Sequence, residues 1–379
     1  MKKVLFCLLF VFALLPLRAQ EPESVENGIL DAVGLIESGE IAAAAGQLDS
    51  LAALAPDNDA IHYYLGICSY AGGKINEAAG HFETAAALDS TNYWYKETLA
   101  NLYVNTGNAA AAEGLFRELK AHDPARYPDI ATRSVLAGAY RMKRDYPAFF
   151  STLAELVRDP DAEDEMKYNA LLGALGNFDA RTFKALVPQM ASLMRIYAEA
   201  EPRSIHAHTL LMQMASEMND RQTVIDECRT LMELQPDDPD AQVTGHAIIG
   251  DNLYASGRKR EAFKSYEKAL KIDPEELTVL NNYAYYLSLD RKRLCKAEKM
   301  SRITIEKEPD NPTFLDTYGW ILYLRGKAAE AKPYFKHAMI YGGKDSAVIL
   351  MHFSLVLEKL GEKDLAAYYA NLAKSKKEE

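Results

Sequence analysis

Residues 250–274 read GDNLYASGRKREAFKSYEKALKIDP, and this stretch decides the fold. Gly257 stands between two segments whose apolar residues recur at helical spacing, and Pro274 ends the second segment. Glycine just past a helix provides the left-handed conformation that turns the chain, and proline cannot continue a helix. The stretch therefore predicts two short antiparallel helices joined by a tight turn.

The same pattern recurs along the chain at a fixed spacing. When residues 58–90 are laid over residues 92–124, small and aromatic residues coincide in several columns, each with a shift of 34 residues. The coinciding pairs are Gly73 with Gly107, Ala78 with Ala112, and Phe82 with Phe116. Small residues let paired helices approach closely, and the aromatic residues fill the space between units. A constant period of this length predicts a stack of helical repeats.

A 34-residue helix-turn-helix unit with these columns resembles the tetratricopeptide repeat. The quoted stretch is close to the consensus of that family, and so is DTYGWILYLRGKAAEAKPYFKHA at residues 316–338. The resemblance covers about eight or nine units. It implies an all-α fold, a right-handed superhelical solenoid of such repeats with one atypical unit in the middle. It also extends to envelope proteins of this type in Gram-negative bacteria.

The order of segments along the chain is predicted from these repeats and from the first residues. Lys2 and Lys3 precede an apolar run at residues 4–17 that falls short of the roughly 20 residues needed to cross a bilayer. We therefore expect a cleaved signal peptide, a mature start near Gln20, and a periplasmic or outer-membrane-associated protein without an integral membrane segment. The expected segments are a signal peptide at 1–19, an N-terminal repeat array at 24–160, an atypical helical pair at 161–203, a C-terminal repeat array at 204–370 and a charged tail at 371–379. The second helix of the atypical pair is expected to be long and to run from about Ala180 to Ala200.

The charge of the chain excludes one class of partner and leaves a second question open. A formal net charge of −11 makes nucleic acid a poor partner. Residues 21–130 hold 17 acidic and 5 basic side chains, whereas residues 251–379 hold 19 acidic and 23 basic ones. These charges are either solvated outer faces or surfaces that meet differently charged partners. The widely spaced Cys68, Cys228 and Cys295 predict buried thiols rather than disulfides or a zinc site.

Catalytic and nucleotide-binding motifs are absent from the sequence. There is no P-loop, HExxH, GxSxG or GxGxxG pattern, so we expect neither an enzyme nor a bound cofactor or metal. The prediction is a scaffold that binds a protein or peptide partner, with an envelope complex as the setting that the resemblance suggests. Two alternatives stay open: an enzyme or enzyme subunit with a site in residues 161–203, and a structural repeat protein that assembles with itself.

A candidate binding surface follows from the resemblance. In this family, the first helix of each unit lines a concave groove, and aromatic side chains on an open groove favour peptide recognition. We expect Tyr285, Trp320 and Tyr323 to form one contiguous patch there; the alternative is that such rings pack against neighbouring helices. The residues predicted to face the groove are Tyr63, Tyr70, Trp94, Asn101, Tyr254, Tyr285, Trp320 and Tyr323.

Overall fold

The structure is a computed structural model that describes residues 23–176, 178–291 and 293–378. The predicted signal peptide at residues 1–19 lies outside these ranges. Every secondary-structure element in the described part of the chain is a helix, as the repeat pattern predicts. The chain forms two compact units that divide between residues 177 and 178, called unit 1 and unit 2 below.

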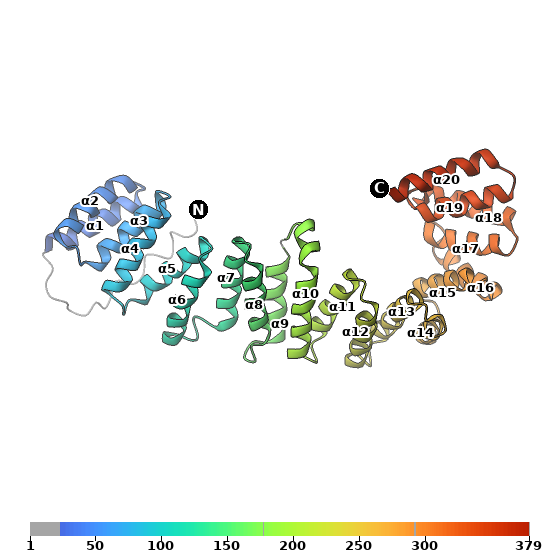
Figure 1. The fold of residues 1–379 in the computed structure, drawn as a ribbon, viewed down its shortest axis with the longest axis horizontal. Coiled ribbons are helices and arrows are strands. Elements are labelled where there is room, and N and C mark those ends of the chain that lie inside the picture. The colour runs from blue at the N-terminus through green and yellow to red at the C-terminus, as the bar shows by residue number, and fades with distance from the viewer. Residues whose placement is uncertain (1–22, 177, 292, 379) are drawn as a thin grey trace. The chain divides into compact units, whose positions relative to one another are not determined.

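Unit 1 contains helices α1 to α9, drawn from blue to green in Figure 1. Their bounds are α1 Glu23–Glu37, α2 Ile41–Leu54, α3 Asp59–Ala71, α4 Ile75–Leu88, α5 Tyr93–Asn105, α6 Ala109–His122, α7 Asp129–Met142, α8 Tyr146–Val157 and α9 Asp164–Leu175.

Unit 2 contains helices α10 to α20 and a short 3-10 helix, and it ends in red in Figure 1. Their bounds are α10 Ala180–Ala200, α11 Ile205–Glu217, α12 Arg221–Leu234, α13 Pro239–Ala255, α14 Lys259–Ile272, α15 Leu277–Leu289, α16 Leu294–Lys307, α17 Pro312–Leu324, α18 Ala328–Ile340, the 3-10 helix Gly343–Asp345, α19 Ala347–Lys359 and α20 Lys363–Glu378.

The helices of unit 2 stack in two layers. Each helix from α13 to α20 packs against the next one along the chain. The first helices of successive repeats also contact each other, α13 with α15, α15 with α17, and α17 with α19. The second helices α14, α16 and α18 each lie between two first helices. The first helices therefore form a shared inner layer, which confirms a helical solenoid in this unit.

Small residues allow the paired helices to approach closely, as their columns predict. A Cβ atom added at Gly250 would lie 2.5 Å from the Tyr266 ring, and one at Gly319 would lie 2.7 Å from the Phe335 ring. Both rings are fully buried. Gly257, in the turn between α13 and α14, has φ of +79°, a conformation that side chains rarely adopt.

The segment 161–203 supplies one helix to each unit. The second helix, α10, spans Ala180–Ala200, which are the bounds expected from the sequence. The first helix, α9, belongs to unit 1, whereas α10 belongs to unit 2. The grouping of the two helices as one atypical repeat stays a prediction.

The expectation that all three cysteines are buried is wrong for one of them. Cys68 and Cys228 are buried in repeat interiors, whereas Cys295 is exposed. Cys295 lies in the first turn of α16, and the buried face of that helix runs through Ala297, Met300 and Ser301 instead. The position of Cys295 on its helix therefore directs its thiol toward solvent.

Candidate functional site

The inner layer of unit 2 carries a partly exposed aromatic surface on α17. The helix begins after Asn311, whose side-chain oxygen accepts hydrogen bonds from the backbone N–H groups of Thr313 at 3.0 Å and Phe314 at 3.3 Å. Most of the helix is buried, whereas Trp320 and Tyr323 stay partly exposed. They are three residues apart, so they lie on the same face of the helix.

The ring of Trp320 stacks on two other rings. It stacks on His352 of α19 with a centroid distance of 4.0 Å and on Tyr323 with a centroid distance of 5.2 Å. The indole N–H of Trp320 is buried and has no acceptor among the described residues. A buried donor without a partner costs about 1–3 kcal/mol, so this group retains an unused capacity to donate a hydrogen bond.

Asp316 and His352 connect α17 to α19 beside that ring. The Nδ1 atom of His352 lies 2.9 Å and 3.1 Å from the two carboxylate oxygens of Asp316. Both residues are buried. Burial raises the pKa of the Tyr285 hydroxyl on α15, and the charge of Asp316 raises it further. Since α15 and α19 both pack against α17, three successive first helices contribute to this part of the inner layer.

We call Tyr285, Asp316, Trp320, Tyr323 and His352 the Trp320 face. The predicted contact between Trp320 and Tyr323 is present, while Tyr285 has its ring contact with Tyr286, at 5.7 Å. The sequence reasoning missed Asp316 and His352. Asp316 lies four residues before Trp320, so helical spacing would have placed it on the same face.

A buried polar chain lies in the same inner layer, on α13 and α15. The Nδ2 group of Asn281 donates to Oδ1 of Asn282 at 3.3 Å, and Asn282 donates to the carboxylate of Asp251 at 3.4 Å. The Tyr266 hydroxyl also donates to Asp251, at 2.5 Å. Burial raises the pKa of Asp251. Oδ1 of Asn281 has no donor among the described residues, so it is a second unmet polar atom in the inner layer.

Tyr254, the remaining predicted residue of unit 2, is part of an internal stack. Its ring lies 4.0 Å from that of Tyr286, and Nζ of Lys259 lies 5.3 Å from its centroid. The ring is partly buried against the core of the unit. Tyr254 therefore supports neighbouring side chains and presents only part of its surface to solvent.

The residues of unit 1 predicted to face the groove differ in their exposure to solvent. Tyr63 is only 5% exposed and stacks on Tyr95 at 5.0 Å, so its ring belongs to the core. Trp94 is 41% exposed, and its indole N–H donates to the Tyr63 hydroxyl at 2.8 Å. Tyr70 and Asn101 are exposed. Trp94 thus has the exposure expected of a binding residue, although its donor is already satisfied.

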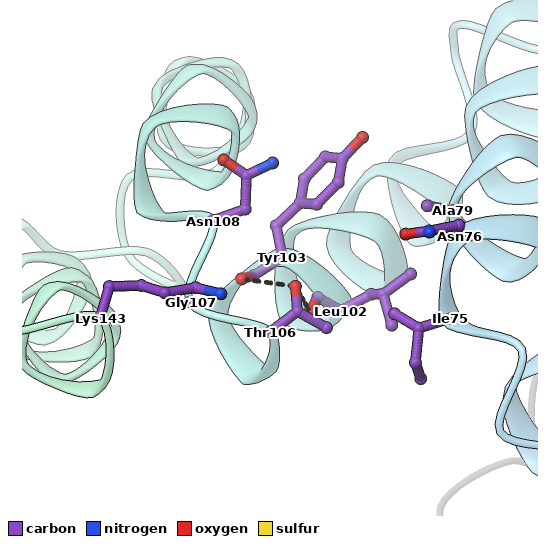
Figure 2. Close-up of a pocket in the computed structure, with 9 residues that line it drawn as sticks. All are labelled: Ile75, Asn76, Ala79, Leu102, Tyr103, Thr106, Gly107, Asn108 and Lys143. Atoms are coloured by element: carbon purple, nitrogen blue, oxygen red, sulfur yellow. Dashed lines mark hydrogen bonds between the residues drawn. The ribbon is translucent and has the colours of Figure 1, made fainter.

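Unit 1 also contains a small open hollow that the sequence did not indicate (Figure 2). It has a volume of about 380 Å³ and lies between the first turn of α4, the last turns of α5 and Lys143. The hydroxyl of Thr106 donates to the backbone carbonyls of Leu102 and Tyr103. The hollow is lined by Ile75, Asn76, Ala79, Leu102, Tyr103, Thr106, Gly107, Asn108 and Lys143.

The described residues contain no group of three or more His, Cys, Asp or Glu side chains arranged to hold a metal ion. Among the described helices, none combines the length and the apolar character that crossing a bilayer requires.

Comparison with known proteins identifies the repeats in unit 1. Two family models described as tetratricopeptide repeat match residues 32–93 and 70–137. A third model, described as bacterial transcriptional activator domain, matches residues 147–282. A tetratricopeptide-repeat-containing protein of Pseudomonas aeruginosa is 25% identical over 151 residues, which cover 30% of this chain and 25% of that protein. The chain thus spans about a quarter of the length of this curated relative.

Solved structures with a similar trace share little sequence with the chain. BtubC from P. vanneervenii is 18% identical with a TM-score of 0.41, over 53% of this chain and 92% of that one. MamA from Desulfovibrio magneticus is 11% identical with a TM-score of 0.38, over 45% of this chain and 93% of that one. Both TM-scores are below 0.5, so neither protein informs the function.

Proposed function

We propose, from the premise that this chain carries tetratricopeptide repeats, that it is an extracytoplasmic scaffold that binds a segment of a partner protein on the Trp320 face. The proposal assigns binding to unit 2 and to the inner layer of α15, α17 and α19. The observation that carries it is the indole N–H of Trp320, a buried donor without an acceptor among the described residues.

The chemistry of this face favours an extended protein segment as the ligand. The partly exposed rings of Trp320 and Tyr323 offer a flat apolar surface for a side chain. A small shift of the indole ring would let its N–H donate to a backbone carbonyl of the bound segment. Oδ1 of Asn281 would likewise accept from a backbone N–H. An extended segment carries both kinds of group along one edge.

Asp316 and His352 hold this surface in place. Their hydrogen bond joins α17 to α19, and the His352 ring supports one side of Trp320. Because both are buried and paired with each other, they support the indole ring rather than attract a charged ligand.

The location is proposed from the first residues of the chain. If the basic start and the apolar run act as a signal peptide, the mature protein begins at or near Gln20. The intact mass of protein purified from its native host tests this. Retention of residues 1–19 in that protein would show the location to be wrong.

Peptide selection tests the binding face directly. A display library of random peptides is selected on the purified protein, and the enriched peptides are titrated against the wild type and two variants. Trp320→Ala removes the ring and the donor and should weaken binding by about 2 kcal/mol. Trp320→Phe removes the N–H and keeps an aromatic ring, so it should have an intermediate effect.

A matched control separates binding from folding. Lys271 is exposed at the end of α14, on the outer layer, so Lys271→Ala should leave peptide affinity unchanged. Circular dichroism should show equal helix content for all three variants. Enriched peptides that bind Trp320→Ala as tightly as the wild type would place the site elsewhere.

A further inference from the structure

Three successive repeat turns of unit 2 are rich in basic side chains. Residues 256–264 hold four basic and one acidic side chain, residues 290–299 hold five basic and two acidic ones, and residues 325–332 hold three basic and one acidic. The tripeptide Arg-Lys-Arg occurs in two of them, at 258–260 and 291–293. We call these three segments the basic edge. The basic edge carries more positive than negative side chains, although the net charge of the whole chain is −11.

Ion pairs between the turns show that the three segments lie at one edge of the unit. Lys259 at the start of α14 pairs with Asp290, which precedes α16. Arg325, at the end of α17, pairs with Glu298 of α16. The turn before α16 is thus tied to the turns of the repeats on either side.

Three arginines of the basic edge form no ion pair with a described residue. Arg260, Arg291 and Arg293 are exposed, and no ion pair joins them to another described residue. By contrast, Arg258 pairs with Glu261 at 2.7 Å. The unpaired guanidinium groups therefore leave a field of positive charge over this edge, and guanidinium groups bind carboxylates well.

The complementary charge is present at the start of the same chain. Residues 21–73 hold nine acidic side chains and no lysine or arginine. Asp31, Glu37 and Glu40 of this stretch are exposed, and none has an ion pair with a described residue. We call the exposed side chains of Asp31, Glu37 and Glu40 the acidic end of unit 1.

We infer that the acidic end of one copy binds the basic edge of a second copy. The contact is heterologous, because two different surfaces of the chain meet. After pairing, one copy keeps a free basic edge and the other keeps a free acidic end, so the association continues beyond a dimer. This inference uses a surface separate from the Trp320 face and goes beyond the proposed function.

A second copy fits these charges better than a uniform polyanion does. Asp290, Glu261 and Glu298 are already paired with cations of the edge, and Glu298 is buried. The arginines without an ion pair are therefore left as a few separate positive charges, which match the few separate carboxylates of the acidic end better than the continuous negative charge of an anionic membrane. Exposed charge pairs contribute little individually and are screened over about 10 Å at 0.1 M salt. The association should therefore be weak and strongly dependent on salt.

Sedimentation velocity of the purified full chain tests the inference with charge reversal. At roughly 20 mM salt the average mass of the wild type should rise with protein concentration, and at roughly 300 mM it should fall to that of a monomer. The edge variant carries Arg260→Glu, Arg291→Glu and Arg293→Glu. The end variant carries Asp31→Lys, Glu37→Lys and Glu40→Lys. Each alone should stay monomeric at low salt, and their equimolar mixture should associate again.

A matched control has the same change in net charge as the edge variant. It carries Lys268→Glu, Lys271→Glu and Lys336→Glu, three exposed residues outside the basic edge, and it should associate like the wild type. Trp320→Ala should also associate normally, which separates this result from the proposed function. A monomeric wild type at low salt, a monomeric mixture or a monomeric control would each overturn the inference. So would a monomeric wild type that binds phosphatidylglycerol vesicles through the same arginines, since the occupant would then be a membrane.

Discussion

The two tryptophans of the chain lie one in each unit, and their indole N–H groups meet different surroundings. Trp94 of unit 1 donates to the Tyr63 hydroxyl at 2.8 Å, whereas the N–H of Trp320 in unit 2 is buried without an acceptor among the described residues. Both rings are partly exposed on first helices. The comparison teaches that a neighbouring side chain, rather than the residue type, decides whether a polar group is left for a partner.

The inner layers of the two units differ in polarity as well. In unit 1, Phe82 fills the space beside Gly66 within a cluster of apolar and tyrosine side chains. In unit 2, Tyr266 fills the equivalent space beside Gly250 and donates to the half-buried Asp251. The repeat geometry is the same, but the ring of unit 2 carries a hydroxyl that is paired with a half-buried carboxylate. The two units should therefore respond differently to pH.

The largest expected effect tests whether the two units are energetically separate. Phe82→Ala in unit 1 and Phe335→Ala in unit 2 each remove a fully or almost fully buried ring, which typically costs about 3–5 kcal/mol. Because stability in repeat arrays passes mainly between neighbours, hydrogen exchange should rise only in the unit that carries the substitution. The control is Tyr368→Ala, since that side chain is 59% exposed. Equal loss of protection in both units after either substitution would contradict the separation.

Overpacking should have the next largest effect. Ala262 is fully buried where α13 and α14 cross, so Ala262→Trp should cost about 1–3 kcal/mol or more. Hydrogen exchange followed by mass spectrometry should show faster exchange in residues 243–310 and unchanged protection in residues 25–90. A uniform loss along the chain would count against a nearest-neighbour account of its stability.

Removing a hydroxyl tests the difference between the two tryptophans. Tyr63→Phe deletes the acceptor of the Trp94 N–H and should cost about 0.5–1.5 kcal/mol in urea unfolding. Tyr323→Phe is the matched change beside Trp320, where the described residues offer the hydroxyl no hydrogen bond, so stability should stay the same. If both variants lose equal stability, the hydrogen bond of Trp94 is not what distinguishes the units.

The smallest expected effect is the change of folding stability with pH, which runs in opposite directions in the two units. Burial raises the pKa of Asp251 in unit 2, so its ionisation destabilises the fold, and stability falls as pH rises from about 4. A hydrogen bond from Lys120 lowers the pKa of Asp129 in unit 1, so its contribution is present at neutral pH and is lost on acidification through the lowered pKa.

Two substitutions make this contrast measurable. Between pH 4 and pH 7, Asp251→Asn should flatten the decline of stability with rising pH. Asp129→Asn should destabilise the protein at pH 7 and have less effect below the ordinary pKa of aspartate, about 3.9. Thermal unfolding from below the ordinary pKa of aspartate up to pH 7, followed by circular dichroism, measures both. The same pH slope for the wild type and Asp251→Asn would show that this carboxyl does not control the response.

Much of the fold could be predicted from the sequence because helices and turns depend on residues a few positions apart. The spacing of apolar residues gave the bounds of α10, Ala180–Ala200, and the glycine column identified the turn at Gly257 with its positive φ. The small residues opposite buried rings, such as Gly250 and Gly319, also followed from their columns. All of these features are determined within one helix or one pair of neighbouring helices, since Gly250 and Tyr266 are only 16 positions apart.

Tertiary structure alone decided which side chains are left for a partner. Tyr63 and Trp94 both occupy predicted groove columns, yet the ring of Tyr63 lies in the core. Asp316 and His352 are 36 residues apart, and their pairing beside Trp320 depends on how α17 packs against α19. The spacing of residues within one repeat predicts that a given side chain faces the next repeat. Burial and pairing depend on the side chain that the next repeat supplies, about 34 residues away, and periodicity does not contain that information.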